Sequence, residues 1–105
     1  MQVYQTITQV GPGKPVLADW QLPNFALTAA VYGSGGSVYS VEYTLDDVNN
    51  AVNQPVRWFT EPLAPVGTTS TGLVLRYLAP IYFIRINVTV LVGTLEFKVL
   101  QGTPH

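Results

Sequence analysis

Apolar and polar side chains alternate strictly in many short stretches of this chain of 105 residues. A period of two residues is typical of a β-strand with one buried face, because successive side chains of a strand point to opposite sides. The stretches with this pattern, or with strong β character, are 3–7, 15–20, 25–31, 37–45, 56–60, 73–78, 84–90 and 94–99. The alternation therefore predicts short strands along the whole chain and leaves little room for helices.

Glycine and proline residues separate these stretches at intervals of roughly ten to twelve residues. Gly33-Ser34-Gly35-Gly36 lies between two of them, and because glycine adopts positive φ without strain, we expect a β-hairpin there. Residues 11–13, 62–67 and 79–80 are expected loops. About eight short strands with this spacing predict an all-β fold, an antiparallel β-sandwich of jelly-roll type. We expect one domain over 1–105, with 1–20 as an arm or an edge strand.

Residues 45–54 are the one stretch without strong β character, and they are rich in Asn and Asp. These residues favour turns and caps over helix interiors, so we expect an extended loop, with one helical turn as the alternative. Asp46 and Asp47 raise the alternative of a calcium loop, because calcium prefers oxygen ligands. The segment lacks the residue pattern of an EF-hand, and a loop bent through Asx turns is the simpler interpretation.

Charged residues make up only 10% of the chain, against about 25% in typical domains, and the net charge is −1. Five scattered Lys and Arg residues give no basic surface for nucleic acid or for an anionic membrane. The chain has no cysteine, so neither a disulfide nor a thiolate zinc site is available. We expect no secretory leader, no membrane span, no metal and no cofactor.

Groups suited to catalysis are scarce. The only histidine is His105, at the end of the chain, where residues tend to be mobile. Glu42 and Glu96 fall on the polar side of alternating strands, where solvated or cross-strand charges are a simpler interpretation than the carboxylate pair of a glycosidase. We therefore predict that the protein is not an enzyme.

Most aromatic residues share the phase of aliphatic neighbours and are expected in the core, among them Phe25, Tyr39, Tyr43 and Phe97. Two aromatic residues break the phase and are candidates for exposed contacts, either as stacking surfaces for a sugar or as anchors of a protein interface. They are Trp58 and Tyr82.

Protein-interface candidates follow from these residues and from the first predicted strand. Arg57 precedes Trp58, and both residue types concentrate at protein interfaces. A terminal edge strand offers unpaired backbone groups to a partner's sheet, which adds Val3 and Tyr4. The predicted interface residues are Val3, Tyr4, Arg57, Trp58 and Tyr82.

The order of four segments resembles a known class of proteins. The segments are Tyr39-Ser40-Val41-Glu42-Tyr43-Thr44-Leu45-Asp46-Asp47, Arg57-Trp58-Phe59, Pro80-Ile81-Tyr82-Phe83-Ile84-Arg85-Ile86-Asn87-Val88-Thr89, and Gly93-Thr94-Leu95-Glu96-Phe97-Lys98-Val99-Leu100-Gln101-Gly102. Over 31–102 this order is similar to that of small β-sandwich proteins encoded among the head genes of tailed bacteriophages. Some short-tailed phages carry such jelly-roll proteins as capsid cement, staple or decoration proteins.

The resemblance implies a non-enzymatic virion protein on the capsid surface, made in the cytoplasm of the host bacterium. Its implied partners are the major capsid protein, whose neighbouring subunits it would clamp, and a second copy of itself. The first predicted strand, or the small-residue face of 25–31, is expected to form the homodimer. The alternative is a head-fibre or tail-associated β-sandwich that binds a carbohydrate or a receptor.

Overall fold

The computed structural model describes residues 2–21, 24–33, 35–50 and 55–102. Within them lie nine strands and one 3-10 turn, and no α-helix. The elements are β1 (Gln2–Ile7), β2 (Gly11–Pro12), β3 (Val16–Leu17), β4 (Leu27–Gly33), β5 (Val38–Thr44), η1 (Val48–Asn50), β6 (Trp58–Thr60), β7 (Gly72–Tyr77), β8 (Phe83–Val90) and β9 (Leu95–Gln101). In this part of the chain, no helix has the length and apolar character needed to cross a membrane.

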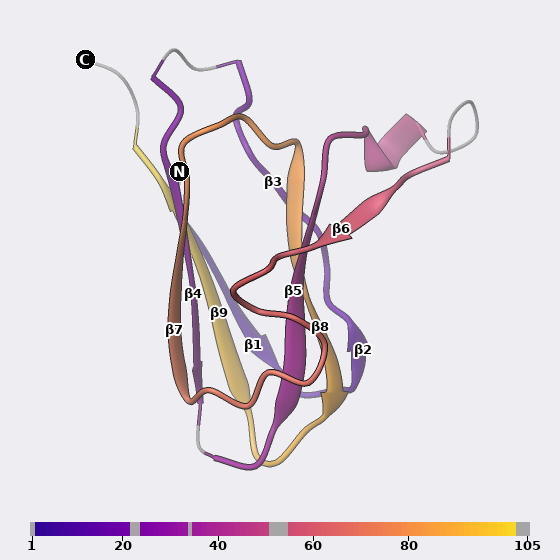
Figure 1. Ribbon diagram of the computed structural model, residues 1–105, viewed down its shortest axis with the longest axis vertical. Coiled ribbons are helices and arrows are strands. Elements are labelled where there is room, and N and C mark those ends of the chain that lie inside the picture. Colours follow the sequence, from indigo (N-terminus) through magenta and orange to yellow (C-terminus); the bar gives the residue numbers. More distant parts are fainter. Residues whose placement is uncertain (1, 22–23, 34, 51–54, 103–105) are drawn as a thin grey trace.

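The strands form two antiparallel sheets that lie face to face (Figure 1). The first sheet has the order β1-β9-β4-β7, and the second has β2 and β3 beside β8, followed by β5 and β6. The pairs are nested: β1 with β9, β2 and β3 with β8, β4 with β7, and β5 with β6. This is the pairing of a long hairpin rolled into two sheets, so the predicted antiparallel sandwich of jelly-roll type is confirmed.

The glycine-rich segment between β4 and β5 does not make a hairpin. β4 belongs to the first sheet and β5 to the second, so the connection crosses from one sheet to the other. Gly36 has a φ of 104°, so the expectation of a glycine with positive φ is right, but the predicted hairpin is wrong. Turn residues fix the local backbone, whereas the choice of partner strand depends on which apolar faces meet across the core.

Two elements differ from their predicted bounds near the beginning of the chain. The expected loop at 11–13 contains β2, whose two residues pair with Val88 and Asn87 of β8. The strand expected over 15–20 is reduced to Val16–Leu17. Proline lacks an N–H donor, and Pro12 and Pro15 therefore limit the pairing of this interrupted edge strand.

The core lies between the sheets, and the predicted phases place most of its residues correctly. On the four longest strands most alternating aliphatic residues point inward and are buried, and Phe25, Tyr39 and Phe97 join them. The phases are wrong at two strand ends, because Leu45 and Val90 are exposed. Tyr43 is half-buried and packs against the same cluster. Strand periodicity therefore identified most of the core.

The acidic segment after β5 contains the single helical turn that was the alternative to an extended loop. The Asp47 Oδ1 atom accepts a hydrogen bond from the Asn49 N–H at 3.0 Å, which is an Asx turn. The Asp46 Oδ2 atom accepts one from the Arg57 N–H at 2.9 Å. Both carboxylates thus hold the backbone of the loop, and residues 51–54 lie outside the described residues.

Candidate binding surfaces

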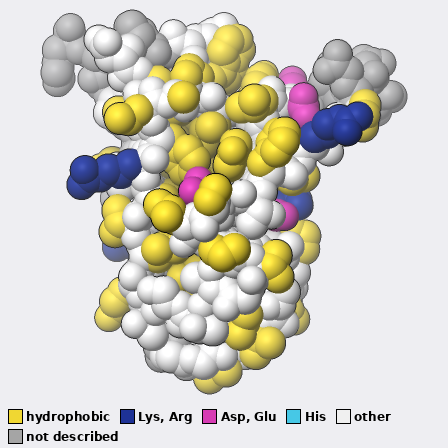
Figure 2. Space-filling model, viewed as in Figure 1, with side chains coloured by type: hydrophobic (Ala, Val, Ile, Leu, Met, Phe, Trp, Pro, Cys, Tyr) yellow, Lys and Arg dark blue, Asp and Glu magenta, His cyan; other side chains and the backbone are white. Residues whose placement is uncertain are grey.

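The five predicted interface residues lie on both sheets. Val3 and Tyr4 belong to β1 in the first sheet, whereas Arg57, Trp58 and Tyr82 lie on or beside the second. Val3 points inward and packs against the core cluster, so of the two β1 residues only Tyr4 is strongly exposed. Figure 2 shows how few charged side chains one side of the molecule carries, with hydrophobic ones around a hollow near its upper end.

The outer face of the first sheet is a regular array of side chains. The strand register sets them in three rows that run across β1, β9, β4 and β7. The rows are Gln2, Leu100, Thr28 and Arg76; Tyr4, Lys98, Ala30 and Val74; and Thr6, Glu96, Tyr32 and Gly72. Small residues on β4 lie in the middle, and exposed large hydrophobic residues surround them.

Two charged side chains on this face, Glu96 and Lys98, both contact Tyr4. The Tyr4 hydroxyl donates a hydrogen bond to Glu96 Oε1 at 2.5 Å, and the Lys98 Nζ atom lies 5.2 Å from the centroid of the Tyr4 ring. The hydrogen bond to Glu96 is the main cause that raises the pKa of the Tyr4 hydroxyl. Apart from these groups and Arg76, the face exposes mainly apolar surface from Tyr32, Val74 and Leu100.

Sequence reasoning missed those three residues. Tyr32, Val74 and Leu100 lie on the phase of their strands opposite to the predicted core, and each is exposed. The sequence did offer a signal for them: in each of three segments, a large apolar residue falls on the phase that faces solvent. Their convergence on one face depends on the strand order, which the alternation alone does not provide.

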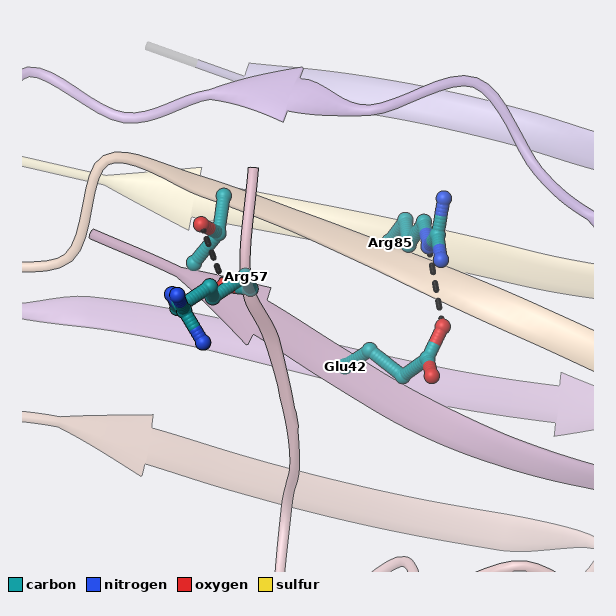
Figure 3. A network of polar contacts seen from close by, with 4 residues as sticks. Glu42, Arg57 and Arg85 are labelled. Carbon is teal, nitrogen blue, oxygen red and sulfur yellow. Dashed lines mark hydrogen bonds and ion pairs between the residues drawn. The ribbon is translucent and has the colours of Figure 1, made fainter. Parts of the chain in front are cut away.

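Trp58 lies on the outer face of the second sheet, where Arg85 covers it. The Arg85 Cζ atom is 3.9 Å from the centroid of the Trp58 ring, and Arg85 Nε lies 2.9 Å from Glu42 Oε1 (Figure 3). The Arg57 side chain points away from this ion pair. Trp58 is half-buried. The Arg85 guanidinium already occupies one face of its ring.

Tyr82 belongs to an aromatic row beside β3. Its ring centroid lies 5.4 Å from that of Trp20 and 5.2 Å from that of Phe83. Trp20 is 42% exposed, and with Leu17 and Asp19 it borders a groove of about 420 Å³. Trp20 was not among the predicted contact residues, because it ends a segment without clear alternation.

Gln101 fixes the segment that carries Trp20. Its side chain is 2% exposed and pairs with the backbone of Asp19. The Oε1 atom accepts a hydrogen bond from the Asp19 N–H at 2.8 Å, and the Nε2 atom donates one to the Asp19 carbonyl at 2.9 Å. The end of β9, a strand of the first sheet, therefore positions the groove at Trp20, which lies beside the second sheet.

Acidic side chains and histidines form no compact group in the part of the chain that the structure describes. Three or more His, Cys, Asp or Glu side chains do not gather there as they would around a metal ion. His105 lies outside the described residues.

Comparisons with protein-family models, with curated proteins and with solved structures found no match for this chain. Its two outer sheet faces and its grooves are therefore the features from which a function is inferred.

Proposed function

We propose that this protein is a non-enzymatic structural component of a bacteriophage virion. It binds the outside of the capsid, bridges neighbouring major capsid subunits and acts as a homodimer. The motif order over 31–102 supports the phage assignment, and the jelly-roll sandwich agrees with the fold that this resemblance implies. A surface with few charges suits such a role, because its contacts are little affected by salt.

The observation that carries the proposal is the outer face of the first sheet. Tyr4, Tyr32, Val74 and Leu100 expose large apolar side chains on all four strands of this sheet, around the small residues Thr28 and Ala30. Contiguous apolar surface of this kind is typical of sites that bind another protein. Small residues at the centre of the face also allow a second sheet to approach closely.

The size of this face sets a limit on how it is used. Strands lie about 4.8 Å apart and residues on one face repeat every ~6.8 Å, so four strands and three rows cover roughly 400 Å². A stable protein interface buries about 800 Å² on each partner. A dimer therefore needs to extend beyond the face, and the free edge of β1 adjoins it.

Capsids test this proposal directly. Particles of the phage that encodes this chain are prepared without it and mixed with the purified protein, and bound protein and the temperature of capsid disruption are measured. We expect saturable binding and greater heat resistance. Failure to bind, with no change in heat resistance, would contradict the proposal.

A second function is favoured by the groove beside Trp20 and Tyr82. An exposed tryptophan next to a tyrosine is the kind of surface on which a sugar ring stacks, as in a head-fibre or tail-associated receptor-binding sandwich. Arg85 already covers one face of Trp58, so Trp20 is the better stacking residue. Binding on a glycan array that Trp20→Ala abolishes, with unchanged unfolding, would favour this function over capsid binding.

A further inference from the structure

A second hollow, of about 410 Å³, opens between the two sheets at the end of the sandwich (Figure 2). Hydrophobic side chains surround an acidic one there. The lining includes Tyr43, Leu45, Glu61, Tyr77, Leu78 and Ile81, together with Arg76, which the strand register places on the outer face of the first sheet and which forms no ion pair with Glu61. We call this hollow the Glu61 cleft. None of the five predicted interface residues lines it.

Glu61 brings a fixed negative charge to the cleft. Its Oε2 atom accepts a hydrogen bond from the Tyr77 hydroxyl at 2.6 Å, and its Oε1 atom accepts one from the Leu63 N–H at 3.3 Å. No Lys or Arg nitrogen of the described residues lies within 4.0 Å of this carboxylate. Each oxygen keeps a lone pair for a further donor, because a carboxylate has about four acceptor positions.

Aromatic rings stand next to this charge. The Tyr43 ring centroid lies 5.7 Å from that of Tyr77, edge to face, and 5.8 Å from that of Phe59, in a stacked arrangement. Burial, together with the hydrogen bond to Glu61, raises the pKa of the Tyr77 hydroxyl. Tyr77 therefore remains a neutral donor that orients the Glu61 carboxylate.

A similar group of a carboxylate and an aromatic ring, with a guanidinium bound to both, lies elsewhere in the same molecule. On the outer face of the second sheet, the Glu42 carboxylate pairs with the Arg85 guanidinium, which lies over the Trp58 ring. The Glu61 cleft has the carboxylate and the rings, whereas none of the described cationic side chains pairs with Glu61. A guanidinium is the group that satisfies both, because it stacks on aromatic rings and donates two parallel hydrogen bonds to a carboxylate.

We propose that the Glu61 cleft binds an arginine side chain of a partner protein. The carboxylate of Glu61 pairs with the guanidinium, and the rings of Tyr43 and Tyr77 contact its planar surface and its methylene stem. Such a contact would give one fixed anchor point, as arginine and tyrosine do at protein interfaces. The proposal stands apart from capsid binding, since it concerns a different surface and needs no capsid for its test.

The probe is n-butylguanidinium, which has the head group and part of the stem of arginine. Its neutral counterpart, n-butylurea, has nearly the same shape without the charge. Each is titrated into the whole protein labelled with ¹⁵N, and amide chemical shifts are followed by NMR. We expect saturable shifts at residues that line the cleft with n-butylguanidinium, and at least about tenfold weaker binding with n-butylurea. Equal binding of the two probes, or no saturable shift at the cleft, would overturn the proposal.

A matched pair of variants tests the role of the charge. Glu61→Gln keeps an oxygen acceptor for the Tyr77 hydroxyl but removes the negative charge, and we expect about tenfold weaker binding of n-butylguanidinium. Glu96→Gln makes the same change on the outer face of the first sheet and should leave binding unaltered. Equal affinity in wild type and Glu61→Gln would refute the assigned role of Glu61. If Glu61→Gln does not fold, Tyr43→Leu, which removes one ring and keeps the carboxylate, should also weaken binding, and unchanged binding there would contradict the proposal.

Discussion

Gly33 ends β4 at a point where the structure has no room for a side chain. A Cβ atom there would lie 2.5 Å from Leu95 Cδ2 and 3.1 Å from the Thr94 carbonyl oxygen. Leu95 is 1% exposed and cannot swing into solvent. We expect Gly33→Ala to lower the free energy of unfolding by about 1–3 kcal/mol, measured by urea denaturation.

Gly72 is the matched control for this substitution. It lies in β7 of the same sheet, and an added Cβ would meet no atom within 4 Å. Gly72→Ala should be neutral or slightly stabilising, because it restricts the unfolded chain. Equal losses of stability in the two variants would show that strand propensity, and not the contact with Leu95, determines the effect.

Tyr77 links stability to pH at the alkaline end. Burial raises the pKa of its hydroxyl above the value of 10.0 that it has in an unfolded chain. Below pH 10 both states keep the proton, whereas above pH 10 the unfolded state loses it first. The free energy of unfolding therefore falls as pH rises past 10, by up to about 1.4 kcal/mol per pH unit for this group.

Tyr77→Phe tests this linkage. Burial also raises the pKa of Tyr39. In wild type, both tyrosines therefore contribute to the slope of the free energy of unfolding against pH, and the variant should lose the contribution of Tyr77. Urea denaturation at pH 9, 10 and 11 measures both slopes. Wild type and Tyr77→Phe with the same slope above pH 10 would contradict the account.

For whole strands, the sequence predicted which face is buried better than it predicted which strands pair with each other. The phases of 25–31 and 94–99 correctly indicated which side chains are buried, whereas Val90, on the apolar phase of 84–90, is exposed. The glycine segment after β4 was assigned to a hairpin because turn residues report only local backbone geometry. The rule that neighbouring segments pair holds for β5 and β6 but fails for β4 and β5, which lie in different sheets.

The candidate surfaces were less predictable for the same reason. Arg57 is exposed, whereas Trp58 and Tyr82, which break the phase of their segments, are half-buried. The approach of Tyr43, Glu61 and Tyr77 was not foreseeable, since they come from separate strands and a loop. Their convergence needs both the strand order and the path of the loop after β6.

Gln101 shows how one strand end can position a loop. Gln101→Met keeps a similar volume but removes both hydrogen bonds to the Asp19 backbone. We expect the free energy of unfolding to fall by about 1–2 kcal/mol, because two hydrogen bonds to the Asp19 backbone are lost, and faster amide exchange at residues 18–21. Leu100→Met, at the exposed neighbouring position, should change neither. Equal stability and exchange in the two variants would contradict this role of Gln101.

In the whole molecule, the edges of the second sheet are covered more than those of the first. The β5 edge continues past β6 into backbone hydrogen bonds with the following loop, from the Val41 N–H to the Ala64 carbonyl at 3.1 Å and between Tyr39 and Thr68 in both directions. Prolines lie along the opposite edge at β2. In the first sheet, β1 and β7 each pair with one strand only, which leaves edges available to a partner.

The asymmetry of the two sheets leads to a specific expectation about assembly. The apolar outer face and the free edge of β1 belong to the same sheet, so we expect both to contribute to one interface of the proposed homodimer. Ala30 lies at the centre of that face. Ala30→Arg places a long charged side chain there without entering the core, and Thr60→Arg makes a similar change on β6 of the other sheet.

Sedimentation velocity of these three proteins at micromolar concentration is the most direct test of the claim that the first sheet is an assembly surface. The account predicts a dimer for wild type and for Thr60→Arg, and a folded monomer for Ala30→Arg. A stable wild-type monomer, or dimers that Ala30→Arg leaves intact, would contradict it.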